Sequence, residues 1–422
     1  MMKNKKSPWL WIPSLYLGQG IPYVIVATTF AAILYKQLGL TNAEITLYTG
    51  WLYLPWVIKP FWSPFVDLFK TKRWWTVTMQ FIMGMAFAGV AFCIPTTYFL
   101  QSTLAIFWLI AFSSATHDIA ADGFYMIALD SHQQSLFVGI RSTFYRIATI
   151  LGQGALVMLA GRLEKVMPTI AQAWSITLYG TAVLFTLIAV YHYFILPKPT
   201  HDQPNPNKNI ALGFFSTFGA FFKKKGIVLA LAFILLYRLG EAQLVKIASL
   251  FLLDGKELGG IGLSTEQVGF VYGTVGILAL TLGGILGGVL AAKDGLKKWL
   301  WIMVFSINLP NLIYVWFAYA QPQNFWLICS GVAVEQFGYG FGFTAFMLYL
   351  IYISRGKLQT AHYAICTGFM ALGMMVPGMF AGKLQELMGY PNFFIWVCVC
   401  TVPAFVLTAF LKIDPLFGKK VL

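Results

Sequence analysis

The chain is built from long apolar segments separated by short polar or turn-forming stretches. Each segment approaches or exceeds the roughly 20 residues that a helix needs to cross a bilayer. Backbone N–H and C=O groups find no partner in lipid, so such segments cross membranes as helices. The pattern predicts an all-α integral membrane protein with twelve transmembrane helices. The twelve segments are 9–34, 44–68, 74–94, 98–128, 136–162, 171–196, 227–253, 264–292, 298–320, 323–353, 359–387 and 391–412.

One polar stretch, from Pro197 to Gly226, divides these segments into six and six. Its first part is rich in proline and asparagine and has too few apolar residues to form a core. Its second part, at 210–225, is aromatic and ends in three lysines, a pattern compatible with a helix on the membrane surface. We therefore expect an N-terminal six-helix bundle at 1–196, a cytoplasmic linker at 197–226 and a C-terminal six-helix bundle at 227–422. This layout is typical of transporters built from two related halves.

Composition and charge agree with a membrane protein. The chain is 59% hydrophobic and only 10% charged, with a mean hydropathy of +0.73, whereas soluble domains are about 25% charged. The net charge is +14, and about nineteen Lys and Arg residues fall on one side of the predicted spans against five on the other. By the positive-inside rule both termini are cytoplasmic. The basic surplus thus contacts anionic lipid rather than nucleic acid.

Two aspartates, Asp118 and Asp122, interrupt the apolar run from Thr103 to Ala128. Their spacing places both carboxylates on one face of a helix. A charged side chain at membrane depth costs about 3 kcal/mol or more, so these residues should face a protein-lined cavity. We expect at least one to carry a proton during transport. The structural alternative is an ion pair with an arginine that fixes neighbouring spans.

The next segment carries Arg141, Tyr145 and Arg146. Arginine keeps its charge and binds carboxylate or phosphate with a two-pronged fork. Arg146 lies deeper and is the better candidate for an anionic substrate, with Tyr145 able to stack on a sugar ring. Arg141 is close to the cytoplasmic end, which favours snorkelling to the membrane surface. Lys59, in the second segment, is a substrate-binding candidate or another snorkelling cation.

The second half of the chain has its own embedded polar residues, and each has a functional and a structural interpretation. Glu241 and Glu335 are candidates for proton coupling. The candidates for substrate binding are Arg238, Lys246 and Gln336. An i, i+3 ion pair between Arg238 and Glu241 would be purely structural.

Enzymatic chemistry has little support in the sequence. Metalloprotease, nucleophile-elbow and CxxC motifs are absent. Asp118 and Asp122 share one helix, so they cannot form the two-helix dyad of an intramembrane aspartyl protease. The five cysteines lie in apolar segments without zinc-ligand spacing. We expect no catalytic residues, no metal and no cofactor.

Several short motifs, in order, resemble the AmpG-type muropeptide permeases of the major facilitator superfamily, and more distantly the acetyl-CoA transporters. The resemblance runs from about Gly18 to Leu411. Its elements are GQGIPY in the first segment, KPFWSPFVD at 59–67, FSSATHDIAADGF in the fourth, YR at 145–146, YRLGEA at 237–242, STEQVG before the eighth and VEQFGYGFGFTAF in the tenth. His117 departs from the pattern, since the permeases usually have glutamine there.

The resemblance implies the major facilitator fold and proton-driven import of N-acetylglucosaminyl-anhydro-N-acetylmuramyl peptides for cell-wall recycling in the bacterial inner membrane. It also implies a latch at the cytoplasmic side, formed by Asp67, Lys72 and Arg73. The second copy of that loop has Ala292 in place of the aspartate. We expect a monomer whose halves rock around a central substrate site. The alternatives are another amphiphilic anion (a CoA thioester, siderophore or oligosaccharide) or a non-transporting membrane sensor.

Overall fold

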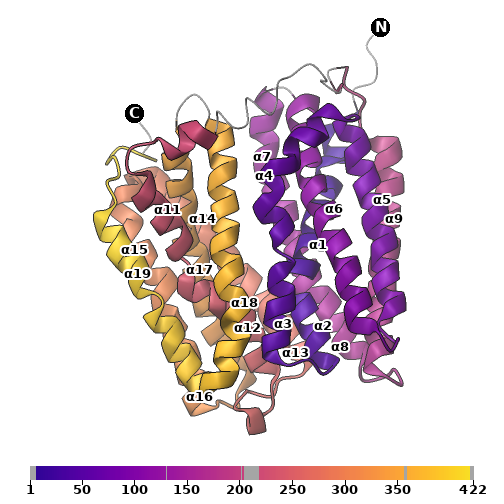
Figure 1. Cartoon of the computed structure of the whole chain (residues 1–422), viewed down its shortest axis with the longest axis vertical. Coiled ribbons are helices and arrows are strands. Elements are labelled where there is room, and N and C mark those ends of the chain that lie inside the picture. Colours follow the sequence, from indigo (N-terminus) through magenta and orange to yellow (C-terminus); the bar gives the residue numbers. More distant parts are fainter. Residues whose placement is uncertain (1–5, 130, 201, 204–217, 356–358, 419–422) are drawn as a thin grey trace. The chain divides into compact units, whose positions relative to one another are not determined.

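Helices make up all the regular secondary structure of the described residues. A computed structural model describes residues 6–129, 131–200, 202–203, 218–355 and 359–418. Contacts divide the chain into two compact units, one of residues 1–38 and 58–208 and the other of residues 39–57 and 209–422. Within each unit the long helices run roughly parallel to one another (Figure 1).

The first unit holds the helices of the N-terminal half apart from α3. They are η1 (Pro8–Leu10), α1 (Ile12–Ala27), α2 (Thr29–Gln37), most of α4 (Leu54–Leu68), α5 (Lys72–Cys93), α6 (Phe99–Ala128), α7 (Ser131–Thr149), the π-helical η2 (Ile150–Ala155), α8 (Leu156–Leu163) and α9 (Ile170–Ile195). An aromatic cluster fills its core at one end, where Trp11 packs edge-on against Phe124 at 5.3 Å. α5 packs along both α6 and α9, and α1 packs along α7.

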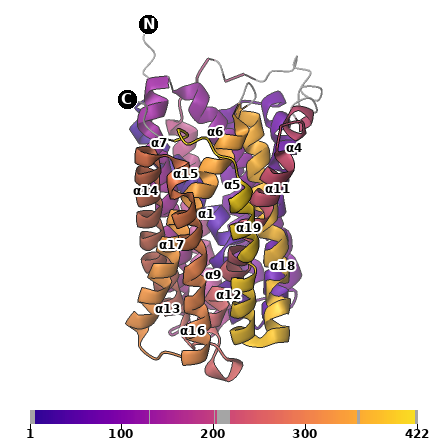
Figure 2. The same ribbon diagram turned by 90° about the vertical axis from the view of Figure 1, so that its left-hand side faces the viewer.

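The second unit contains α3 and the helices after residue 209. They are α3 (Asn42–Trp51), α11 (Ile227–Leu236), α12 (Leu239–Leu253), η3 (Lys256–Leu258), α13 (Thr265–Phe270), the π-helical η4 (Val271–Gly276), α14 (Ile277–Asp294), α15 (Leu296–Asn308), η5 (Leu309–Asn311), α16 (Leu312–Ala320), α17 (Phe325–Ser354), α18 (Gln359–Val399) and α19 (Val402–Phe410). α14 and α17 run side by side (Figure 2).

Ten helical segments among the described residues are long and apolar enough to cross a membrane. The difference from the twelve expected segments has two local causes. The segment expected at 44–68 is broken at Leu52 and Tyr53 into α3 and α4, each shorter than 18 residues. The last two expected segments follow each other without a loop, and the non-helical backbone of Gly389, with φ of +73°, separates two helices within α18. Only glycine adopts that backbone conformation at little cost.

Local sequence explains several helix ends. Thr41 and Glu44 form a capping box at the start of α3, as Ser264 and Gln267 do at α13. In the linker, residues 218–222 are helical, and Phe221 is buried in the core of the second unit. The rest of the 210–225 segment, up to residue 217, lies outside the described residues. The bundle and linker boundaries expected from the sequence remain predictions.

Candidate functional site

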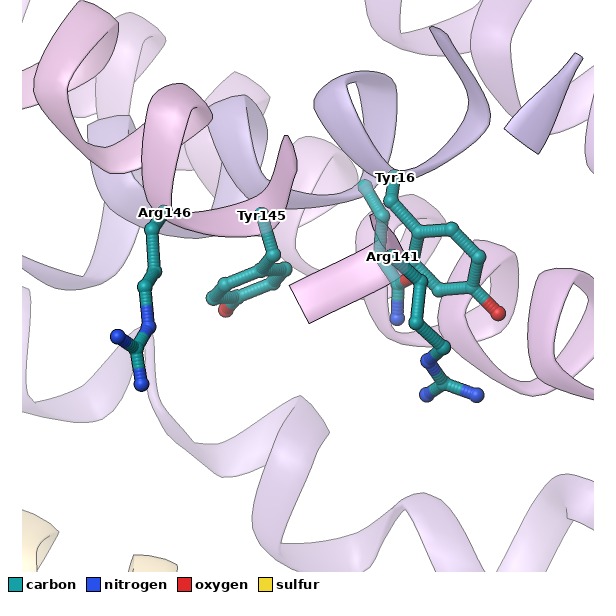
Figure 3. Close-up of a pocket in the computed structure, with 5 residues that line it drawn as sticks. Tyr16, Arg141, Tyr145 and Arg146 are labelled. Atoms are coloured by element: carbon teal, nitrogen blue, oxygen red, sulfur yellow. The ribbon is translucent and has the colours of Figure 1, made fainter. Parts of the chain in front are cut away.

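A cavity of about 270 Å³ opens in the first unit between α1 and α7. Tyr16 and Gln19 line it from α1, and Arg141, Tyr145 and Arg146 line it from α7. The labelled side chains extend toward the same space, with Tyr145 between the two guanidinium groups (Figure 3). The two helices also meet closely, since a Cβ on Gly20 would lie 2.6 Å from the Cβ of Ala148. The sequence did not predict that Tyr16, Gln19 and Arg141 share this cavity with Tyr145 and Arg146.

Arg141 is held at one end of this cavity by Asp122. Its Nη2 lies 3.0 Å from Asp122 Oδ1, and Tyr16 donates a hydrogen bond to the same oxygen at 3.2 Å. The guanidinium also lies over the rings of Tyr16 and Tyr125, with centroid distances of 4.6 and 5.1 Å. The structure thus differs from the expectation that Arg141 snorkels, because two aromatic rings and a carboxylate hold it inside the unit.

Arg146 occupies the other end of the cavity. It is partly buried, and its side chain makes no ion pair or hydrogen bond with any described residue. Tyr145, beside it, lines the same cavity. A cation left without a protein partner in a cavity can neutralise an anion that enters from outside.

Asp118, one turn before Asp122 on α6, faces a different cation. Lys59 Nζ of α4 lies 3.7 Å from Asp118 Oδ2. The two aspartates therefore tie α6 to three helices, Asp118 to α4 and Asp122 to α7 and α1. The structural alternative, an ion pair between an embedded aspartate and an arginine, is formed by Asp122 with Arg141, and Arg146 forms no ion pair with either aspartate.

A buried chain of hydrogen bonds crosses the same unit and was not foreseen. His117 Nε2 bonds to Gln80 Nε2 at 2.9 Å, Gln80 Oε1 bonds to His192 Nδ1 at 2.9 Å, and His192 Nε2 bonds to Ser14 Oγ at 2.8 Å. It joins α6, α5, α9 and α1. The polar residues inside apolar segments were the only sequence signal, because their partners lie far apart along the chain. These hydrogen bonds hold α6, the helix that contains both aspartates, in place.

The candidate residues of the second unit form three separate contacts. Arg238 donates a hydrogen bond to the Tyr339 hydroxyl. The described residues show no ion pair between Arg238 and Glu241, the structural alternative predicted from the sequence. Gln336 Nε2 donates to Glu335 Oε2 at 2.9 Å. Lys246 lies deep in the unit.

Lys246 contacts the short helix α3. Its Nζ donates to Thr49 Oγ1 at 3.3 Å and lies 4.9 Å from the centre of the Tyr53 ring. A second link joins the other end of α3 to the unit. Asn42 Nδ2 donates to Gln385 Oε1, Asp254 Oδ2 and the Tyr390 hydroxyl at 2.7, 3.3 and 2.9 Å. The sequence did not predict this hydrogen-bonded cluster. Asp254 lies at the end of an apolar segment, where a charged residue is usually exposed in a loop.

The predicted latch residues lie at the start of α5. The backbone N–H groups of Lys72 and Arg73 donate to the two oxygens of Asp202, at 2.7 and 3.0 Å. A carboxylate at a helix N-terminus satisfies free N–H groups and complements the helix dipole. The side chain of Arg73 donates to the carbonyls of Tyr193 and Leu196 at the end of α9. The side chain of Asp67 lies outside the described part of the structure.

Within the described residues, no group of three or more His, Cys, Asp or Glu side chains comes together as a metal site. The five cysteines are free thiols. The polar groups of both units are instead organised by ion pairs, cation–π contacts and hydrogen bonds within apolar helices.

Comparison with known proteins adds the decisive observation. The family model described as "Major Facilitator Superfamily" matches residues 14–350. The chain belongs to the Major Facilitator Superfamily. It is therefore a multi-pass membrane transporter of small molecules, as expected, rather than an enzyme.

Relatives and solved structures agree with this membership. "Putative transporter AmpG 4" of Rickettsia conorii is 27% identical over 412 residues, which cover 94% of this chain and 95% of that protein. "Anhydromuropeptide permease" of Escherichia coli K12 is 26% identical over 400 residues, covering 93% and 77%. These similarities confirm the resemblance to AmpG-type permeases.

Solved transporters share the fold at lower identity. The nucleoside transporter NupG superposes with a TM-score of 0.71 at 16% identity, covering 98% of this chain and 100% of that one. A D-xylose–proton symporter superposes with a TM-score of 0.73 at 11% identity, covering 98% and 99%. At such identities the match supports the major facilitator fold alone.

Proposed function

We propose that this protein imports anhydromuropeptides from the periplasm to the cytoplasm by proton-coupled alternating access in the bacterial inner membrane. In this proposal it acts as a monomer with both termini in the cytoplasm, and the six-helix halves at 1–196 and 227–422 move against each other. The name of the Escherichia coli relative, which is aligned along most of this chain, supports this substrate class.

The main support for the proposal is the position of Arg146. Its guanidinium lines the cavity of the first unit and has no protein partner among the described residues. Tyr16 and Tyr145 line the same space, and Gln19 adds an amide. A cation beside two phenol rings and an amide suits an anionic ligand that also carries sugar rings and amide groups. Anhydromuropeptides have all three.

The size of the cavity defines how much of the substrate it takes. Its volume, about 270 Å³, is at or below the lower end of ligand pockets, which run from roughly 300 to 1,000 Å³. The cavity therefore receives one end of the substrate, with a peptide carboxylate against Arg146 and the adjoining group against Tyr145. The remaining substrate-binding candidates, Lys59, Arg238, Lys246 and Gln336, lie outside it. In the proposal they contact the rest of the molecule or hold the helices in place.

The two arginines of α7 have different roles in the proposal, because Arg141 forms an ion pair and Arg146 forms none with the described residues. Arg141 is already neutralised by Asp122, so it positions Tyr16 and does not bind the substrate carboxylate. Arg146 supplies the free positive charge. Lys72 and Arg73, at the start of α5, together with Asp67, form the cytoplasmic latch of the proposal.

The test is uptake of radiolabelled anhydromuropeptide into proteoliposomes, with and without an inward proton gradient. We expect uptake that the gradient stimulates. Arg146→Gln should lower it by tenfold or more, since a charge-assisted contact to a carboxylate contributes about 1.5–3 kcal/mol. Arg162→Gln, which changes an arginine farther along the same predicted span, is the matched control and should leave uptake unchanged.

Three outcomes would overturn parts of the proposal. Uptake that ignores the gradient would remove proton coupling. Uptake of a CoA thioester, siderophore or oligosaccharide in preference to anhydromuropeptide would replace the substrate. Ligand binding without any transport into sealed vesicles would favour a sensor.

A further inference from the structure

Gln19 lines the cavity of the first unit from α1. Its side chain is only 7% exposed, and its amide oxygen Oε1 is buried without a hydrogen-bond partner among the described residues. Leaving a buried acceptor unpaired costs free energy, and native proteins contain few such atoms. A buried, unpaired oxygen on the wall of a cavity is therefore a place for a hydrogen-bond donor of a ligand.

The other buried glutamines of the described residues are paired at the same atom. Their Oε1 atoms accept hydrogen bonds at 2.7–2.9 Å, from His192 Nδ1 in Gln80, from Trp396 Nε1 in Gln243 and from Asn42 Nδ2 in Gln385. None of these three glutamines lines the cavity. Packing thus satisfies the amide oxygens that lie away from the cavity, and it leaves unpaired the one that lies at its wall.

Gly20, the next residue, explains why Gln19 reaches the cavity. A Cβ on Gly20 would lie 3.2 Å from the carbonyl oxygen of Tyr145 and 2.6 Å from the Cβ of Ala148. Because glycine has no Cβ, α1 packs closely along α7 at the turn that contains Tyr145 and Arg146. Gln19 is therefore held next to the residues of α7 that line the same cavity.

The other polar groups of the cavity wall differ in whether they already have a partner. The Tyr16 hydroxyl donates to Asp122, and Arg141 forms an ion pair with the same carboxylate. Arg146 has no ion pair or hydrogen bond with the described residues. A ligand therefore finds a free cation in Arg146 and a buried acceptor in Gln19.

An acylated amino acid presents the two groups that match this wall. Its carboxylate and its amide nitrogen are bonded to the same carbon atom, so both fit together in a cavity of about 270 Å³. The last residue of a peptide has this arrangement. A free amino acid would instead bring an ammonium group close to the Arg146 cation, which like-charge repulsion disfavours. A hydroxy acid joined through an ester has the carboxylate but no donor for Gln19.

We propose that Gln19 determines specificity for the peptide end of the substrate. Its Oε1 accepts a hydrogen bond from the N–H of the last peptide bond, while Arg146 binds the adjoining carboxylate. This inference rests on the proposed function, from which it takes the contact between Arg146 and a peptide carboxylate. A ligand without the N–H leaves Oε1 buried and unpaired, and a site built to bond an N–H rejects such analogues strongly.

The test compares a peptide bond with an ester. Titration calorimetry measures how tightly the purified, full-length protein binds an anhydromuropeptide and its analogue in which oxygen replaces the N–H of the last peptide bond. The two ligands have the same charge and nearly the same shape. We expect the wild type to bind the peptide about tenfold or more tightly than the ester, because the ester oxygen is an acceptor and leaves Oε1 unpaired.

Three variants separate the hydrogen bond from the charge. Gln19→Met keeps the length of the side chain without its amide, so it should bind peptide and ester with about the same affinity. Arg146→Gln should weaken both ligands and keep their ratio, because it changes the carboxylate contact. Gln101→Leu, at an exposed glutamine of α6, is the control and should keep the wild-type affinities. A ratio of affinities does not depend on how much of a variant is folded.

Two results would overturn the role of Gln19: equal affinities of the wild type for peptide and ester, or a ratio that Gln19→Met leaves unchanged. If the wild type binds neither ligand, the proposed substrate is wrong. The ratio is then measured with an acetylated dipeptide and its ester, and failure to bind this pair would overturn the role of Gln19 as well. Binding with the expected ratio but without uptake into proteoliposomes would overturn transport and support the role of Gln19.

Discussion

At the scale of single residues, the embedded acids are distinguished by what lies against them. Asp118 faces Lys59, and Asp122 faces Arg141. Glu241 and Glu335 are buried, and Glu335 accepts a hydrogen bond from Gln336. Embedded carboxylates therefore form ion pairs in the first unit, whereas the described residues show no ion pair with the two glutamates of the second. The cause is tertiary packing, since all four acids interrupt apolar segments in the same way.

The Lys59–Asp118 pair leads to a charge-balance prediction. Asp118→Asn leaves the Lys59 cation without its carboxylate in an apolar span, at a cost of up to about 3 kcal/mol. We expect less folded protein and a lower thermal unfolding midpoint in detergent. Adding Lys59→Gln should restore most of the loss, because no unpaired charge remains. A double variant that loses as much as the two single variants combined would contradict the pairing.

The sequence identified candidate functional residues, but it did not show which residues contact them. The position of Asp118 and Asp122 in an apolar run was enough to mark them as functional candidates. Their cations were not predictable, because Lys59 and Arg141 come from two other helices. Arg141 was assigned to the membrane surface by its distance from the helix end, and the rings of Tyr16 and Tyr125 hold it inside instead. Asp202 and Asp254 were missed, since both lie in loops or at segment ends.

At the scale of elements, the short helix α3 depends on close backbone approach to α18. A Cβ on Gly382 of α18 would lie 2.0 Å from the carbonyl oxygen of Asn42, and one on Gly50 would lie 2.3 Å from Met379 Cγ. Small residues allow such contacts between helices in a membrane, where no hydrophobic effect draws helices together. Which helices meet this closely could not be predicted from the sequence. The break between α3 and α4 was not expected either.

Gly382→Ala should therefore loosen the contact between α3 and α18. The added methyl group meets backbone rather than a flexible side chain, so we expect a loss of about 1–3 kcal/mol of stability. The thermal unfolding midpoint in detergent measures it. Gly288→Ala is the matched control, because a Cβ there meets nothing within 4 Å, and it should leave the midpoint unchanged or slightly raised. Equal midpoints for both variants would argue against the close approach.

At the scale of the whole molecule, length and hydropathy predicted the class of fold because the membrane leaves few alternatives. A chain with this many apolar segments is confined to helices, and the match of residues 14–350 to the superfamily agrees. The orientation rests on the distribution of Lys and Arg alone. It stays a prediction.

Reporter fusions test that orientation. Green fluorescent protein attached after Leu422 should fluoresce, because it folds in the cytoplasm. Alkaline phosphatase fused after Glu257 should be active, because that loop is predicted to be periplasmic and the enzyme needs periplasmic disulfides. If the fluorescent protein fusion does not fluoresce and the phosphatase fusion is inactive, the orientation is the reverse of the predicted one. A fusion after Lys36, on the same predicted side as Glu257, provides the control.

The placement of α3 has a consequence for how the chain can be divided. Residues 39–57 belong to the second unit, although residues 1–38 and 58–208 belong to the first. The polypeptide therefore passes between the units three times rather than once. If the gene is split between residues 208 and 209, the C-terminal fragment loses the helix that bonds to Asp254, Gln385 and Tyr390, and the N-terminal fragment carries that helix instead. Co-expressed fragments should then reassemble by lending α3 from one to the other, as partners do in domain swapping.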